Sequence, residues 1–247
     1  MVLSLQAWFD MPLGQALLQA ELELCAAQLK EIYGYYALQI SGHADEDWIH
    51  PCAMARQYHA ALSPSAIPTI SASSLVTSPT ELPFPSDMFD LVCLPHCLEQ
   101  VAQPQHLLAE IHRVLVPNGK LMILGFNPLS YWWLWQRIHP TEILAPICAL
   151  GSIGLRRLSH WLAGQDYQLL GHRTFFYVPP LNNAERLARM AALSHAVAFA
   201  LPCAGAVYAV LASKQSIALT PRRLQFNYRK VVAKPERMAP SGTRRSG

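Results

Sequence analysis

Three common catalytic motifs are absent from this chain. It has no Walker phosphate-binding loop, no Gly-x-Ser-x-Gly nucleophile elbow and no His-Glu-x-x-His zinc motif. These absences remove the commonest nucleotide-hydrolysing, esterase and zinc-protease interpretations. Metal binding has little other support. Pro95 separates Cys93 from Cys97, and His106 and His112 would point to different faces of a helix.

Paired cysteine motifs and a targeting segment are also missing. The six cysteines have no Cys-x-x-Cys spacing and mostly lie in apolar runs, so we expect reduced thiols in the core. The first ten residues have no basic segment and no small-residue cleavage site. We therefore expect no secretory signal and a cytoplasmic location.

Charged residues are scarce, at 14% of the 247 residues, whereas hydrophobic residues make up 52%. Extensive burial, a membrane contact or a partner surface must absorb this apolar excess. The length suits a single core, and we expect one α/β domain over residues 1–213. No internal repeat is visible.

The basic residues are concentrated in the C-terminal segment, residues 214–247. This segment holds nine Lys or Arg and one Glu and has no apolar periodicity, so we expect a disordered basic tail. Such a tail could contact anionic lipid weakly at a membrane surface, although a solvated tail is the commoner outcome. No specific nucleic-acid partner is predicted.

The stretch from Leu82 to Asn127 predicts a strand, a helix and a second strand. Residues 89–94 are short and almost wholly apolar, which is typical of a strand covered on both faces. From Pro104 onward the apolar residues follow a 3.6-residue period, and Pro117-Asn118-Gly119 ends this amphipathic helix. Asn118 and Gly119 can both take positive φ and turn the chain into the apolar strand that ends near residue 126.

This unit predicts two parallel strands joined by a right-handed crossover helix. The functional edge of such a Rossmann-like sheet lies at the carboxyl ends of the strands. Those ends are Leu94-Pro95-His96 and the segment 125–128.

The same stretch resembles a known family. Leu-Pro-Phe from residue 82, Phe-Asp-Leu-Val from residue 89, His-x-Leu-Glu from residue 96 and Arg-Val-Leu-x-Pro-x-Gly from residue 113 occur in order. This ordered set resembles the second half of the class I S-adenosylmethionine-dependent methyltransferases of the type-11 family. The resemblance implies a Rossmann-like, doubly wound, seven-stranded and mostly parallel sheet that binds S-adenosylmethionine at its carboxyl edge.

The family's first motif is degenerate here. The strand expected at residues 35–40 is followed by a turn with one glycine, where the family has a glycine-rich loop that lets the backbone approach the cofactor closely. The second strand is expected at residues 57–62, and Ser63 stands near the place where the family has a ribose-binding acid. The resemblance places the cofactor contacts at Ser41, Gly42, His43, Ser63, Leu94, Pro95 and His96.

His96 is the candidate general base, because it follows the fourth strand where donor and acceptor would meet. A neutral imidazole can accept a proton near pH 7. The alternative is a histidine that only bonds the backbone of its loop. Glu99 matches the acid of the family's Leu-Glu-His, with Gln100 in place of the histidine, and a structural role near a helix start is the favoured interpretation.

Residues 127–135 form the densest aromatic cluster in the chain. In the resembling family this segment follows a strand whose carboxyl end faces the substrate, so Asn127, Tyr131 and Trp132 are candidates for the substrate side. An aromatic wall for an apolar or planar substrate is one interpretation. A surface that contacts a membrane or partner is another, and ordinary packing of a helix on the sheet is the third.

The remaining elements are expected to complete the methyltransferase topology. Residues 190–212 contain no Asp, Glu, Lys or Arg, but Pro202, Cys203 and Gly205 interrupt them, so a helix and a closing strand are favoured over a membrane span. The other expected elements are an N-terminal helix at 12–31, a short strand near 67–72, helices at 154–162 and 182–197, and strands at 167–178 and 205–213.

Two functions remain open from the sequence. The first is an S-adenosylmethionine-dependent methyltransferase acting on an unidentified small molecule. The second is a non-catalytic binding or scaffold protein of the same fold, which the single glycine and the missing ribose acid both favour. A membrane-surface role that uses the aromatic cluster and the basic tail could coexist with either function. The sequence does not indicate the oligomeric state.

Overall fold

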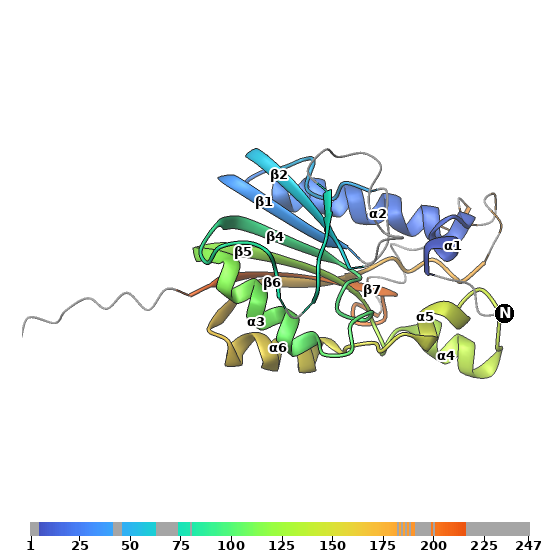
Figure 1. Ribbon diagram of the computed structural model, residues 1–247. Coiled ribbons are helices and arrows are strands. Elements are labelled where there is room, and N and C mark those ends of the chain that lie inside the picture. The colour runs from blue at the N-terminus through green and yellow to red at the C-terminus, as the bar shows by residue number, and fades with distance from the viewer. Residues whose placement is uncertain are drawn as a thin grey trace, which may run out of the picture. The chain divides into compact units, whose positions relative to one another are not determined.

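The computed structural model describes residues 5–41, 46–62, 74–79, 81–181, 183, 185, 187, 189–190, 199 and 201–215. A seven-stranded sheet with the order β3-β2-β1-β4-β5-β7-β6 forms the centre of the protein (Figure 1). Only β7 runs antiparallel to its neighbours. The strands are β1 (Tyr33–Ser41), β2 (Ala53–Ala61), β3 (Ser74–Val76), β4 (Phe89–Pro95), β5 (Leu115–Phe126), β6 (Tyr167–Phe175) and β7 (Val207–Lys214).

Helices cover both faces of the sheet. They are α1 (Leu5–Phe9), α2 (Pro12–Leu29), α3 (Pro104–Val114), α4 (Tyr131–Ile138), α5 (Ala145–Ala149) and α6 (Leu155–Gly164). Figure 1 shows α2 on one face and α3 and α6 on the other. The doubly wound arrangement and the seven strands predicted from the sequence are therefore confirmed.

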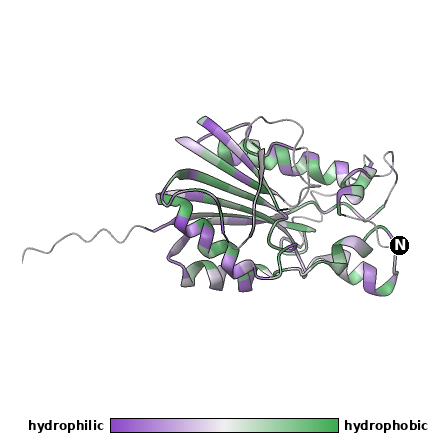
Figure 2. Cartoon of the chain, in the orientation of Figure 1, coloured by the Kyte–Doolittle hydropathy of each residue, from purple (hydrophilic) through white to green (hydrophobic). Residues whose placement is uncertain are grey.

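Alternate residues of the central strands supply two separate cores. Leu91 and Cys93 of β4 pack with the α1 and α2 side chains, whereas Val92 and Leu94 pack with those of α3 and α6. Successive side chains of a strand point to opposite faces, so a strand with both faces covered must be apolar throughout. Figure 2 shows the hydrophobic colour along the central strands and a mixture of colours along α3 and α6, whose outer faces are polar.

The residues that carry the family resemblance form a structural clamp. The Arg113 guanidinium donates to both carboxyl oxygens of Glu110, at 2.8 and 3.0 Å, and to the backbone carbonyl oxygens of Leu82 and Phe84, at 3.0 and 2.8 Å. The Glu110 carboxylate in turn accepts the backbone N–H of Leu82 at 3.0 Å. Hydrogen bonds to charged groups are stronger than neutral ones, so this clamp fixes the loop before β4 to α3.

Asp90 ties the start of β4 to β1. Its Oδ2 accepts the backbone N–H groups of Tyr35 at 2.7 Å and Tyr36 at 3.0 Å, where the ladder between the two strands has not yet begun. A side chain on Gly34 would collide with Asp90, since a Cβ there would lie 2.6 Å from its Cγ. This part of the Phe-Asp-Leu-Val motif therefore aligns strands.

No helix occurs in the described part of the connection between β1 and β2, residues 46–52. The buried Gln39 side chain holds this segment instead, donating to the Glu46 carbonyl at 2.7 Å and accepting the Trp48 N–H at 2.9 Å. Trp48 and Ile49 then pack into the core beneath α2. The N-terminal helix thus covers a sheet face on which parallel strands commonly place a crossover helix.

Most predicted boundaries agree with the structure, with small corrections. The N-terminal helix ends at Leu29 and is preceded by α1, which the sequence did not predict; the last two strands lie at 167–175 and 207–214. The prediction that Pro117-Asn118-Gly119 ends the helix is wrong: α3 ends at Val114, and these residues lie within β5, where only Asn118 has positive φ, at 66°. Cys203 is exposed and Cys148 half-buried, so the expectation of buried thiols is wrong for these two.

Some predictions fall on residues outside the described ranges. The strand expected near 67–72 is one of them; the described third strand lies at 74–76. Within the helix expected at 182–197, four of the described residues are helical: Glu185, Leu187, Arg189 and Met190. Among the described residues, no helix has both the length and the apolar character needed to cross a membrane. The last six residues of the 190–212 run, 207–212, belong to strand β7.

Candidate functional site

The candidate site lies at the carboxyl edge of the sheet, where β4 ends. Figure 1 shows α1, α4 and α5 gathered at this edge. His96 is the first residue after β4, with a φ of 47° and its backbone N–H bonded to the Leu124 carbonyl at 3.0 Å. A left-handed backbone is uncommon for a residue other than glycine, and such strained residues cluster at functional sites.

A buried ion pair joins this edge to the N-terminal helix. The Nε2 atom of His96 lies 2.6 Å from Oε1 of Glu21 on α2, and neither side chain has any exposed surface. The imidazole also packs between Phe9 of α1 and Phe126 of β5, with ring centroids 5.7 and 4.1 Å away. Burying two charged groups costs desolvation free energy unless they form an ion pair with each other. The pair therefore requires α1 and α2 to pack closely against the carboxyl edge of the sheet.

Opposing effects set the pKa of His96. Burial lowers it, because a cation is poorly solvated in the interior. The charge and hydrogen bond of Glu21, together with the charge of Glu99, outweigh burial and raise the pKa above the ordinary 6.5. The Glu21 contact therefore favours the charged form of the imidazole.

Glu99 forms the second carboxyl group of the site. Its Oε1 accepts the Phe126 N–H at 2.7 Å, while burial raises the pKa of the carboxyl group despite the nearby His96. Gly125 makes the approach possible, because a Cβ at this position would lie 2.8 Å from Glu99 Oε1 and 2.5 Å from Tyr208 Oη. Burial, followed by the charge of Glu99, raises the pKa of Tyr208 well above its usual value.

Two carboxyl oxygens of the site remain available. Oε2 of Glu21 and Oε2 of Glu99 are buried and have no hydrogen-bond partner within the described ranges of the chain. Unsatisfied buried acceptors are uncommon and costly, and they suit a cation or a hydrogen-bond donor. These two acceptor oxygens therefore suit a positively charged ligand.

The structure brings only some of the sequence-predicted cofactor residues to this edge. Ser41, Leu94, Pro95 and His96 are buried where β1 and β4 end. Gly42, His43 and Ser63 lie outside the described residues. Sequence reasoning missed Glu21, although the sequence contained a signal for it: a carboxylate at helical spacing between Leu17, Leu18 and Cys25 interrupts an otherwise apolar stripe.

The predicted substrate-side residues support the backbone in this structure. Asn127 donates from its amide to the carbonyl oxygens of Cys203 and Gly205, at 2.9 and 2.8 Å. Trp132 is buried and donates to the Val178 carbonyl at 2.9 Å and the Tyr131 hydroxyl at 3.1 Å. These contacts fix the start of α4, and other residues of the same segment line the adjacent pocket.

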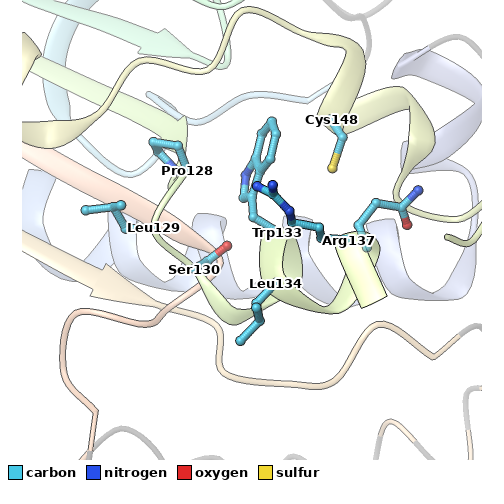
Figure 3. A pocket seen from close by; sticks show the side chains of 8 residues that line it. Pro128, Leu129, Ser130, Trp133, Leu134, Arg137 and Cys148 are labelled. Carbon is cyan, nitrogen blue, oxygen red and sulfur yellow. The ribbon is translucent and has the colours of Figure 1, made fainter. Parts of the chain in front are cut away.

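That pocket is open and has a volume of about 560 Å³. It lies between α4, the loop that precedes it and Cys148 of α5 (Figure 3). The lining residues are Pro128, Leu129, Ser130, Trp133, Leu134, Gln136, Arg137 and Cys148.

Comparisons with known sequences point to one family. Residues 49–123 match the family model described as a methyltransferase domain. The uncharacterized protein YafS of Escherichia coli (strain K12) is 27% identical over 220 residues, which cover 89% of this chain and 85% of YafS. The ubiquinone/menaquinone biosynthesis C-methyltransferase UbiE of Vibrio cholerae is 40% identical over 84 residues, a match that covers only 32% of each protein.

Solved structures agree with this fold. A chain of the complex between the Haloferax volcanii Trm112 methyltransferase activator and a methyltransferase has a TM-score of 0.58 at 14% identity, covering 86% of this chain and 98% of that one. An S-adenosylmethionine-dependent methyltransferase from Mesorhizobium loti scores 0.55 at 14% identity, covering 78% and 97%. Geranyl diphosphate C-methyltransferase from Streptomyces coelicolor scores 0.54 at 13% identity, covering 81% and 80%.

These likenesses of solved structures show the fold, and the strand order shows it independently. The family match of residues 49–123 includes β2, β4, α3 and most of β5, the part of the chain held together by the Arg113 clamp. Residues 49–123 therefore match the methyltransferase-domain family, and the chain as a whole has the class I methyltransferase fold.

Proposed function

We propose that this protein transfers a methyl group from S-adenosylmethionine to a small-molecule acceptor at the carboxyl edge of β1 and β4. The observation that carries this proposal is the buried cluster of Glu21, His96 and Glu99 at the end of β4. Buried ionisable groups are costly, and clusters in which burial and neighbouring charges shift the pKa values are commonly functional.

The buried carboxyl oxygens suit the donor's charge. S-adenosylmethionine supplies a methyl group on a positively charged sulfonium, and it also carries an ammonium group. Oε2 of Glu21 and Oε2 of Glu99 can accept from or attract such groups at this edge. Ser41, Gly42, His43, Leu94, Pro95 and His96 are the proposed cofactor contacts, with Ser63 near the ribose.

His96 is the proposed general base, and Glu21 its positioning residue. Methyl transfer depends chiefly on holding donor and acceptor in line and excluding water, and a base is needed only where the acceptor must lose a proton. Glu21 holds the imidazole by its Nε2, which fixes the ring against Phe126. Because His96 is fully buried, an acceptor reaches it only when the contact with Phe9 or Glu21 opens.

A second function is favoured by specific features of the same edge. The turn after β1 has one glycine, Ser63 replaces an acid, and α1 and α2 close over His96. A non-catalytic protein of this fold, which binds or scaffolds another molecule, would need neither an open cofactor site nor a mobile base. The two functions differ in whether the donor binds.

Calorimetric titration with S-adenosylmethionine and S-adenosylhomocysteine distinguishes them. We expect binding in the micromolar range that a Gly42→Trp variant loses, because an indole would block the first loop. Gly171→Trp is the matched control: Gly171 has no atom within 4 Å of its Cβ position and lies on β6, away from β1 in the strand order. No heat from a folded wild-type protein would contradict the enzymatic proposal and support the scaffold.

Small-molecule methylation is the form of transfer that the comparisons favour. The Streptomyces coelicolor neighbour was solved with geranyl diphosphate and S-adenosylhomocysteine, and the matched relatives include quinone-biosynthesis methyltransferases. A cytoplasmic location and a weak contact between the basic tail and a membrane surface remain predictions. Sedimentation with anionic vesicles at low and high salt would test the tail contact.

A further inference from the structure

The pocket beside α4 has a donor-rich polar side that the site at His96 does not use. Ser130, Trp133 and Arg137 lie three and four residues apart along the start and length of α4, and therefore share one face of the helix. Figure 3 shows their side chains around the same space, with Cys148 facing them from α5. All three can donate hydrogen bonds: a hydroxyl, an indole N–H and a guanidinium.

These donors are not satisfied by the protein. Ser130 is 3% exposed, and its Oγ has no hydrogen-bond partner among the residues that the structure describes. The Arg137 guanidinium makes no hydrogen bond or ion pair with any described residue, in contrast to Arg113, which makes several. A buried hydroxyl without a partner is costly, so a ligand atom that accepts from Ser130 would remove a penalty.

The rest of the lining is mainly apolar, apart from Gln136, whose side-chain amide is bonded to Thr141. Pro128, Leu129, Leu134 and the Trp133 ring supply most of the wall, and Leu129 and Leu134 are 78% and 61% exposed. No Asp or Glu is among the described residues that line the pocket. Its volume of about 560 Å³ lies in the range of pockets that enclose single small molecules.

We propose that this pocket binds the methyl acceptor and that the acceptor is a small, soluble, mainly apolar molecule with one anionic group, such as a carboxylate or phosphate. Arg137 pairs with the anion, Ser130 donates a second hydrogen bond, and Trp133 stacks on the apolar part. The segment that forms the pocket follows β5 directly, and β5 neighbours β4 at the carboxyl edge. The assignment of an acceptor rests on the proposed methyltransferase function, but the ligand chemistry is testable without it.

Two fluorescent probes that differ in one charge test the chemistry. Anilinonaphthalene sulfonate has two aromatic groups and one sulfonate, and phenylnaphthylamine has the same rings without the anion. We expect wild-type protein to bind the sulfonate probe more tightly than the neutral one. Arg137→Gln should weaken binding of the sulfonate probe by about five-fold, the effect expected from the loss of one exposed charge-assisted hydrogen bond. Binding of the neutral probe should not change.

Matched variants separate this pocket from other apolar surface. Arg137→Lys keeps the charge and should retain most of the preference for the sulfonate. Arg157→Gln removes a cation that lies over Trp161 on α6, 4.7 Å from the ring centroid, and should change neither probe. The proposal would be overturned if Arg137→Gln weakened the binding of both probes equally. It would also be overturned if Arg157→Gln weakened binding of the sulfonate probe as much as Arg137→Gln does.

The source of the anion is tested by competition. Monomeric octanoate, an apolar chain with one carboxylate, should displace the sulfonate probe from wild-type protein and fail to do so from Arg137→Gln at the same concentration. A bilayer lipid would instead be the source of the anion if the wild-type protein pellets with phosphatidylglycerol vesicles, the Arg137→Gln variant does not, and octanoate fails to displace the probe. That result would overturn the proposal of a soluble ligand. Probe binding that follows these expectations in a protein that binds no S-adenosylmethionine would support the ligand chemistry and contradict the methyltransferase role.

Discussion

Replacing Glu21 by leucine should destabilise the protein strongly. The change leaves His96 buried, with no exposed surface, and without the carboxyl group that lies 2.6 Å from its Nε2. Removing one partner of a buried ion pair typically costs about 3–5 kcal/mol of unfolding free energy. For a protein of this size each kcal/mol lowers Tm by roughly 2–4 °C, so a fall of about 6–20 °C is expected.

Two further variants make this prediction specific to the pair. Adding His96→Phe to Glu21→Leu removes both ionisable groups and keeps an aromatic ring beside Phe126, so it should recover most of the lost stability. Glu23→Leu changes an exposed residue of the same helix and should shift the free energy by less than about 0.5 kcal/mol.

The pair also predicts a pH dependence. The pKa of His96 is raised in the folded protein, so the native state binds more protons than the unfolded state between pH 6.5 and the folded pKa. The resulting stability is fully present below pH 6.5 and is lost as the pH rises through the folded pKa. In Glu21→Leu, burial becomes the main effect on His96 and lowers its pKa, so this loss should disappear.

Urea unfolding followed by tryptophan fluorescence measures both effects. The free energies of wild type, both single variants and the double variant are compared at several pH values, with the m values checked for constancy. A Glu21→Leu protein within about 0.5 kcal/mol of wild type, or a double variant no more stable than the single one, would refute the argument from the buried pair.

Two other substitutions test contacts next to the site and in the clamp. Gly125→Ala places a Cβ 2.5 Å from Tyr208 Oη and 2.8 Å from Glu99 Oε1, so unfolding free energy should fall by about 1–3 kcal/mol in urea titrations, and an unchanged value would contradict the close packing. Arg113→Lys loses the bidentate interaction with Glu110, so the free energy of unfolding should fall by about 1–3 kcal/mol and the loop before β4 should be cleaved faster by proteases. Arg156→Lys, at an exposed position on α6, is the control.

The sequence predicted the fold because its motif residues act on the backbone. Arg113, Glu110 and Asp90 each bond to backbone groups of another segment, and their spacing is therefore constrained by the geometry of one strand-helix-strand unit. Apolar periodicity added the rest, since a covered strand and an amphipathic helix differ plainly in pattern. These interactions are local in sequence, or join neighbouring elements of the sheet.

The site was predicted less completely because its main contact joins residues far apart in sequence. Glu21 and His96 are 75 residues apart, and helical periodicity alone cannot indicate which strand end a carboxylate on α2 will meet. The connection after β1 was equally hidden. Gln39 reads as one more residue of a strand, yet its amide holds residues 46 and 48 in a connection whose described part contains no helix.

The N-terminal helices therefore supply contacts to His96 from outside the matched methyltransferase domain. The matched methyltransferase domain covers residues 49–123 and supplies His96 and Glu99, whereas the carboxyl group that raises the pKa of His96 comes from residue 21, outside that match. The same N-terminal segment places Phe9 against the imidazole. Since α1 and α2 together cover His96, and Glu21 of α2 favours its charged form, ligand binding at this edge and the protonation of His96 should be coupled. A ligand that displaces Glu21 removes the group that raises the pKa of the imidazole, and thereby favours the neutral form that can accept a proton.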